Sequence, residues 1–205
     1  EVEDIKFTHP STPYAVAVDP VHGKLYWSEA DFRGIAAFGR IMRADLNGDN
    51  VETVVPTAFN SVPNALALDL ENAEMFWNDT QADSVNRATL DGDFRQTIAV
   101  GLRQLEGIVL DVVAHKVYWA DCNSQKIQRA NADGSQKEDF LAAPNFCPKG
   151  LAFDAVARQL YWSGAFGSSA PGNRIQRGSV DTLQIEDIGS DATQGPWGIA
   201  LDIDR

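Results

Sequence analysis

The chain has 205 residues, 44% of them hydrophobic, so it is long enough and apolar enough to bury a core. Its net charge of −12 argues against nucleic acid as a partner, because phosphate binding needs clustered Lys and Arg. No apolar run approaches the ~20 residues of a membrane helix, and the two cysteines and three scattered histidines show no metal-ligand spacing. We therefore expect no membrane insertion by this segment, no metal and no other cofactor.

An aromatic pair recurs along the chain, and an aspartate stands eight residues before the tryptophan of each pair. A short apolar run precedes each aspartate, and a further run, Gly198–Leu201, with Asp202 begins another copy. In chain order the pairs are Tyr26-Trp27, Phe76-Trp77, Tyr118-Trp119 and Tyr161-Trp162. Such self-similarity indicates one supersecondary unit used several times.

Each unit divides into four short strands, A to D. The apolar run (A) and the strand with the aromatic pair (B) are apolar at successive positions, which predicts burial on both faces. Strand C alternates, as in Lys126–Ala130, and a weaker strand D follows a tight turn. Asn47-Gly48, Asp91-Gly92 and Asp133-Gly134 supply positive φ in three of these turns, whereas Asp181-Thr182 predicts another turn type in the fourth.

Four antiparallel strands per ~40–45 residues are typical of a propeller blade. The predicted fold is therefore all-β, a β-propeller of four-stranded antiparallel blades with four complete repeats and the start of a fifth. We expect one incomplete propeller domain over residues 1–205. Its blades fall at about 11–57, 62–100, 104–143 and 147–190, with a partial blade at 195–205.

The motifs Tyr26-Trp-Ser-Glu29, Phe76-Trp-Asn-Asp79, Tyr118-Trp-Ala-Asp121 and Tyr161-Trp-Ser-Gly164 resemble the YWTD propeller of the low-density-lipoprotein-receptor family, with its class B repeats, over nearly the whole chain. The resemblance implies structural roles for the motif tryptophans Trp27, Trp77, Trp119 and Trp162. It also implies that Asp79 and Asp121 bond to the backbone of a neighbouring blade. Glu29 and Gly164 depart from the motif, so their blades need a different contact.

That family usually closes six blades, so the resemblance implies that this chain is part of a six-bladed ring. Residues 1–7 are then a candidate ring-closing strand. The missing blades come from the rest of a longer polypeptide or from a partner chain. We favour the longer polypeptide, because an open ring would expose two apolar blade faces.

A ligand site should break the repeat, so the recurring Asp and Arg residues are expected to be structural. The position before each apolar run varies and is expected to ring the channel mouth: Tyr14, Asn64, Glu106, Lys149 and Trp197. The B–C loops of the first and fourth units are long and contribute further contact candidates: Phe32, Arg33, Phe38 and Phe166. Ordinary channel lining and tolerated insertions explain these features equally well.

Cys122 follows strand B of the third unit, and Cys147 lies in the connector to the fourth. The topology places both on one face, which favours a disulfide and an oxidising compartment over two free thiols. Asn78-Asp79-Thr80 is a glycosylation sequon, but its asparagine lies inside a strand, where a glycan would not fit.

The function predicted from these features is an extracellular or secretory-lumen scaffold that binds another protein, through a basic segment or a peptide loop of that partner. A structural module of a larger extracellular assembly is one alternative. A propeller hydrolase of the calcium-dependent lactonase or strictosidine-synthase type is another. Such an enzyme needs several acidic residues converging on the axis, and Glu106 is the one acid among the mouth positions. We therefore assign no catalytic residue.

Overall fold

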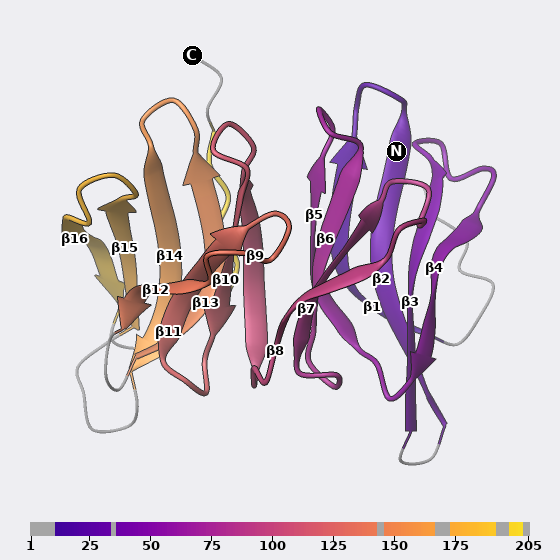
Figure 1. The fold of residues 1–205 in the computed structure, drawn as a ribbon, viewed down its shortest axis with the longest axis horizontal. Coiled ribbons are helices and arrows are strands. Elements are labelled where there is room, and N and C mark those ends of the chain that lie inside the picture. Colours follow the sequence, from indigo (N-terminus) through magenta and orange to yellow (C-terminus); the bar gives the residue numbers. More distant parts are fainter. Residues whose placement is uncertain (1–10, 34–35, 143–145, 167–172, 192–196, 203–205) are drawn as a thin grey trace. The chain divides into compact units, whose positions relative to one another are not determined.

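The computed structural model describes residues 11–33, 36–142, 146–166, 173–191 and 197–202. Its strands form four antiparallel sheets, ordered β1-β2-β3-β4, β5-β6-β7-β8, β9-β10-β11-β12 and β13-β14-β15-β16 (Figure 1). Each sheet is a meander of four strands that are consecutive in sequence, as in a propeller blade. The predicted fold class, an all-β propeller of four-stranded antiparallel blades, is confirmed. The candidate ring-closing strand at residues 1–7 lies outside the described residues.

The chain divides into two compact units, residues 1–97 and 98–205. The strands of the first two sheets are β1 Thr12–Asp19, β2 Lys24–Arg33, β3 Ala36–Asp45, β4 Glu52–Phe59, β5 Pro63–Asp69, β6 Glu74–Asp79, β7 Ser84–Thr89 and β8 Gln96–Val100. Those of the other two are β9 Leu105–Asp111, β10 Lys116–Asp121, β11 Lys126–Asn131, β12 Glu138–Ala142, β13 Phe146–Asp154, β14 Gln159–Phe166, β15 Asn173–Ser179 and β16 Ile185–Asp191. Among the described residues there is no helix long and apolar enough to cross a membrane.

The core of the first unit lies between its two sheets. Tyr26, Ile41 and Val55 of the first sheet are buried against Trp77 and Met75 of the second. The B strands supply the largest of these side chains, because they are apolar at successive positions and place one aromatic ring on each face.

The second unit repeats this arrangement between its own two sheets. Tyr118 stacks on Phe153 with ring centroids 6.0 Å apart, and Phe140 meets Trp162 edge to face at 6.3 Å. Trp162 and Leu160 are fully buried in this cluster. In both units, the tyrosine or phenylalanine side of one B strand faces the tryptophan side of the next.

The recurring aspartates close the turns between strands A and B. Asp19 Oδ1 accepts hydrogen bonds from the amides of Val21 and His22, and Asp154 Oδ1 accepts from those of Val156 and Ala157. Burial opposes the charge on Asp19, but the bonds from His22 and Val21 outweigh it and lower the pKa of this carboxyl. These aspartates are therefore used by the turns, as the repetition predicted.

Two of the recurring arginines tie neighbouring sheets together. Arg43 Nη1 donates to Leu90 O at 3.3 Å and to Asp91 Oδ1 at 2.7 Å, so it bridges the first sheet to the C–D turn of the second. Arg129 Nη1 makes the equivalent bond to Val180 O at 3.3 Å. Burial lowers the pKa of Arg43, but its bonds to Tyr26 and Asp91 outweigh that effect and raise it, so the bridge stays charged.

Two details differ from the sequence-based expectation. Strand β1 is not buried on both faces, because Val16 and Val18 are 65% and 53% exposed while the alternating Ala15 and Ala17 pack on the core. The long B–C segment of the first blade is mostly a hairpin rather than a loop. Strands β2 and β3 continue pairing through Phe32↔Ala37, because extended backbone satisfies its hydrogen bonds across the ladder.

Candidate functional site

The varying position before each apolar run is a β-bulge in the innermost strand of all four blades. The ladder skips Tyr14 between Pro13 and Ala15, and it skips Asn64 between Pro63 and Ala65. The same irregularity spans Glu106 in β9 and Lys149 in β13. A bulge leaves one residue unpaired and re-aims its side chain. The fold therefore displays the most variable residue of each repeat at the same point.

A buried side chain of the motif supports the bulge in three blades. The amide after the bulged residue donates to Ser28 Oγ at 3.1 Å, to Asn78 Oδ1 at 3.0 Å and to Ser163 Oγ at 3.0 Å. These acceptors occupy the third position of the aromatic motif and are fully buried. Sequence reasoning missed this role, although the small polar residue after three of the four tryptophans was a visible signal. In the third blade the position is Ala120.

The hydrogen bond between Asn78 and the amide of Ala65 also bears on whether the sequon at Asn78 can be glycosylated. Asn78 is fully buried in β6, and its side-chain oxygen is used inside the sheet. Oligosaccharyl transfer needs an accessible amide nitrogen, so the folded blade has no room for a glycan there.

In the second unit the bulges bring three predicted residues together. Lys149 Nζ lies 2.5 Å from Glu106 Oε1 and 4.3 Å from the centre of the Trp197 ring. Lys149 and Glu106 are partly buried, whereas Trp197 is 68% exposed. The ammonium group is thus held between a carboxylate and an indole face, a combined ion pair and cation–π contact. We refer to Glu106, Lys149 and Trp197 as the bulge cluster.

Two glycines allow the inner strands of this unit to approach closely. A Cβ at Gly107 would lie 2.6 Å from Lys149 O, and a Cβ at Gly150 would lie 2.6 Å from Trp197 O. A close approach of a glycine Cα to a backbone carbonyl therefore sets β9 beside β13, and an equivalent approach sets β13 beside the segment 197–202. That segment occupies the inner-strand position of a further repeat, although it carries no β-ladder in the described residues.

In the first unit, Tyr14 is exposed at its bulge and Asn64 is partly buried at the next. The B–C hairpin adds Phe32, which is exposed, and Phe38, whose ring meets Phe59 edge to face at 5.8 Å. Phe59, at the end of β4, was not predicted as a contact residue, yet it is one of the most exposed aromatic side chains of the unit. The side chains of Arg33 and Phe166 lie outside the described part of the structure.

The predicted disulfide is present between Cys122 and Cys147, which are 25 residues apart in sequence. Cys147 lies two residues before Lys149 in β13. The amide of Cys122 donates to Gln104 O at 3.2 Å, two residues before Glu106. The cross-link thus fastens both chain segments that carry the ion pair of the bulge cluster.

The fourth motif position has different partners in the first three blades, apart from the turn amide three residues further on that both Asp79 and Asp121 accept from. Asp79 accepts from the amide of Val62 at 2.9 Å and from Ser61 Oγ, so it holds the connector that arrives from the first blade. Asp121 accepts from the amide of Ser124 at 2.9 Å. Glu29, one methylene longer, accepts from Trp27 Nε1 at 3.0 Å and pairs with Arg40 at 2.5 Å.

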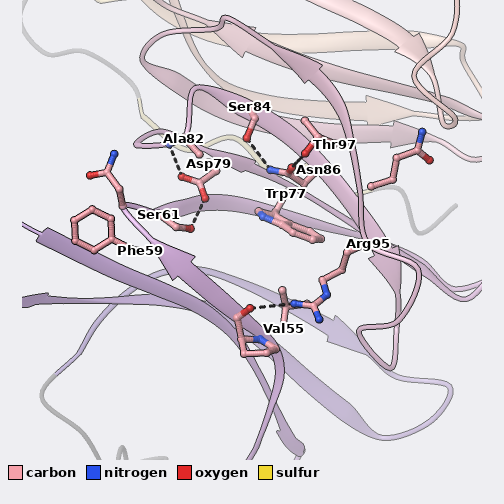
Figure 2. Close-up of a pocket in the computed structure, with 13 residues that line it drawn as sticks. Val55, Phe59, Ser61, Trp77, Asp79, Ala82, Ser84, Asn86, Arg95 and Thr97 are labelled. Carbon is pink, nitrogen blue, oxygen red and sulfur yellow. Dashed lines mark hydrogen bonds between the residues drawn. The ribbon is translucent and has the colours of Figure 1, made fainter.

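A cleft of about 280 Å³ opens between β4 and the second sheet of the first unit (Figure 2). Its wall on the β4 side includes Val55, Pro56 and Phe59. The opposite wall is formed by Trp77, Asp79, Ala82, Ser84, Asn86, Arg95, Gln96 and Thr97, and Asn60 and Ser61 join the two walls. Sequence reasoning did not predict this cleft. Within the described residues, no group of three or more His, Cys, Asp or Glu could hold a metal ion.

No family model matches the chain. It is 30% identical over 86 residues to the low-density lipoprotein receptor-related protein 5-like protein of Homo sapiens, a match that spans 42% of this chain and 32% of that protein. The vitellogenin receptor of Solenopsis invicta shows the same identity over 86 residues, or 42% of this chain and 4% of that receptor. The matched part is thus a third or less of these relatives.

Among solved structures, the nidogen/laminin complex contains a chain with a TM-score of 0.77 and 26% identity, covering 92% of this chain and 68% of that one. A virginiamycin B lyase from Staphylococcus aureus has a TM-score of 0.70 at 19% identity, covering 96% of this chain and 62% of that one. The lyase shows the fold alone.

The four-stranded meanders, with their bulged inner strands, define a β-propeller. Among β-propellers, the aromatic motifs and the receptor relatives point to the YWTD type. The chain is a β-propeller that is similar, in its YWTD-type motifs and in these relatives, to the low-density-lipoprotein-receptor family.

Proposed function

We propose that the chain is part of an extracellular, receptor-type propeller that binds another protein through the side of its blades that carries the bulges and the B–C hairpins. The observation that carries this proposal is the bulge cluster. An exposed Trp197 covers Lys149, and Lys149 is in turn paired with Glu106. Exposed tryptophans on a rigid support are typical anchors of protein interfaces.

The chemistry of the cluster favours a peptide loop as the contacting segment. The indole offers a large apolar face, and Glu106 offers carboxylate oxygens beside it. The net charge of −12 would attract a basic segment at long range. In the first unit we propose Tyr14, Asn64, Phe32 and Phe38 as further contacts, and from the sequence alone we add Arg33 and Phe166.

The compartment is proposed from the disulfide and from the relatives. Disulfides persist in oxidising environments such as the extracellular space and the secretory lumen. The curated relatives are a receptor and a receptor-related protein. We propose no catalytic role, since Glu106, the one carboxylate at the five variable positions, is ion-paired.

We further propose that another blade, from a longer polypeptide, covers the exposed face of β1 as part of a six-bladed ring. Val16 and Val18 occupy the positions of Leu66 and Leu68 in β5, which pack on the core of the first unit. Two exposed valines, at positions where the next blade packs a buried and a partly buried leucine on the core, support a missing neighbour.

The nidogen structure is a complex with laminin, so laminin is the first partner to test. We expect surface plasmon resonance to show at least 10-fold weaker binding for Trp197→Ala and Lys149→Glu than for the wild type, as for truncation of an interface anchor. Val156→Ala, at a highly exposed position of the same unit, should bind like the wild type.

If laminin does not bind, the same variants are compared by capture of partners from extracellular matrix extract. A partner retained equally by Trp197→Ala and by the wild type would overturn the assignment of the binding site.

A further inference from the structure

The indole N–H of the motif tryptophan finds an acceptor within its own blade in three of the four blades. Trp27 Nε1 donates to Glu29 at 3.0 Å, Trp119 Nε1 to Gln128 at 3.3 Å, and Trp162 Nε1 to Gln176 at 2.9 Å. In the third and fourth blades the acceptor is thus a glutamine directly opposite the tryptophan in the ladder.

Each of these glutamines is held by a charged pair. Gln128 Nε2 donates to Asp139 at 2.7 Å, and Lys126 Nζ lies 2.7 Å from the other oxygen of the same carboxylate. Gln176, Asp187 and Arg174 repeat the arrangement with distances of 2.6 Å and 2.8 Å. In both blades a cation, a carboxylate and an amide therefore form one hydrogen-bonded network that ends at the indole N–H.

In the second blade, shorter side chains occupy the positions of this network. Asn86 stands opposite Trp77, where the third and fourth blades have glutamine, and Ser84 occupies the position of the cation. Thr97 Oγ1 donates to Asn86 Oδ1 at 2.7 Å, and Asn86 Nδ2 donates to Ser84 Oγ at 3.0 Å. These three short side chains bond to one another and not to the indole.

The Trp77 ring is 95% buried and lines the cleft shown in Figure 2, and no residue that the structure describes accepts from its indole N–H, which is not itself enclosed. The exposed fraction of Trp77 is 5%. Trp77 is the one motif tryptophan whose indole N–H has no acceptor among the described residues. Its blade is also the one that has the shorter Asn86 where the third and fourth blades have glutamine. The indole N–H is therefore available to donate to a ligand that brings an acceptor into the cleft.

The other groups of the cleft indicate which acceptor fits. The Arg95 guanidinium, exposed at the wall, donates to Pro56 O at 3.1 Å and has further N–H groups. The carboxylate of Asp79 already accepts from Ser61, Val62, Gln81 and Ala82, so it does not compete for these donors. Phe59 and Val55 offer apolar contact beside them.

We propose that this cleft binds an extended acidic peptide segment and that a glutamate carboxylate of that segment accepts from the Trp77 indole N–H. The glutamate takes the place that a glutamine of the chain itself takes in the third and fourth blades. A carboxylate suits the cleft better than an amide, because both Trp77 and Arg95 present donors. The net charge of −12 repels such a segment at long range, so recognition depends on these short-range bonds.

The cleft belongs to the first unit and involves no residue of the bulge cluster, so this proposal stands or falls separately from the proposed function. The probe is the capped peptide acetyl-Ala-Ala-Glu-Ala-Ala-amide, with Gln and Ala versions of its central residue. The readout is the indole N–H signal of Trp77 in a ¹H–¹⁵N spectrum, assigned by its absence in Trp77→Phe. We expect the glutamate peptide to shift this signal and to bind at least 10-fold more tightly than the alanine peptide.

Asn86→Gln gives the decisive variant, because it rebuilds the internal acceptor. It should weaken binding of the glutamate peptide at least 10-fold while the protein remains folded by circular dichroism. Asn123→Gln makes the same chemical change at an exposed position of the second unit and should bind like the wild type. The proposal is overturned if the Trp77 signal does not move, if Asn86→Gln binds as well as the wild type, or if the glutamine peptide matches the glutamate peptide.

Discussion

The ring of Phe146 fills the space that a side chain at Gly164 would need. A Cβ built on Gly164 would overlap this ring and lie 2.7 Å from Cys147 O. Phe146 is fully buried, and its backbone pairs with the strand that carries the glycine. The fourth blade has therefore replaced the motif carboxylate with an aromatic ring from its own inner strand.

Restoring the motif should consequently destabilise the protein. We expect Gly164→Asp to lower the free energy of unfolding by about 1–3 kcal/mol or more, because the core cannot hold both side chains. Urea unfolding of Gly164→Ala in the wild-type and Phe146→Ala backgrounds tests the cause. The cost should be smaller when the ring is absent, and an equal cost in both backgrounds would contradict the steric explanation.

The support of the bulge by Ser163 makes a second prediction. Ser163→Ala leaves the partly buried amide of Gly150 without its acceptor and should cost roughly 0.5–1.5 kcal/mol of the free energy of unfolding. Hydrogen exchange at Gly150 should accelerate at the same time. The amide of Ala65, which donates to Asn78, is the internal control and should exchange as before. Unchanged exchange at Gly150 would show that the hydroxyl does not support the bulge.

The disulfide should stabilise the fold chiefly by restricting the unfolded chain. For a loop with a sequence separation of 25, the double variant Cys122→Ser/Cys147→Ser should lose about 3 kcal/mol. Thermal unfolding by calorimetry measures the loss, and reduction of the wild type should reproduce it. A midpoint that neither treatment changes would mean that the cross-link contributes nothing to stability.

The hydrogen-bonded network of Lys126, Asp139 and Gln128 in the third blade should make the free energy of unfolding depend on pH in the acid range. Hydrogen bonds from Lys126 and Gln128 lower the pKa of Asp139 below its ordinary value. The carboxylate therefore binds protons less readily in the folded state. Its stabilising contribution is complete above the unfolded pKa of about 3.9 and is lost as the pH falls through the lower, folded pKa.

The variant Asp139→Asn isolates this contribution. Denaturant unfolding should show the wild type to be more stable than the variant at pH 6, with the difference shrinking below about pH 4. A difference that stays constant down to pH 2 would contradict the assignment to this carboxylate.

Some of the candidate site was predictable and some was not. The variable positions Glu106 and Lys149 stood out because they interrupt a regular repeat, and repetition is visible in a linear sequence. Their salt bridge and the indole of Trp197 beside it depend on how far neighbouring inner strands approach, which Gly107 and Gly150 determine through backbone contact. Phe59 escaped notice because nothing in its local sequence distinguishes a strand end that is exposed from one that is covered.

The sequence by itself determined the blade: four strands in order, the turn residues, and the aromatic pair that fills the core. These are local properties, set by periodicity, turn chemistry and the burial of apolar side chains. The tertiary structure decided which donors and acceptors meet. Contacts between strands determine the role of Ser28, Asn78 and Ser163, the ring beside Gly164, and the Trp77 indole N–H that faces the cleft.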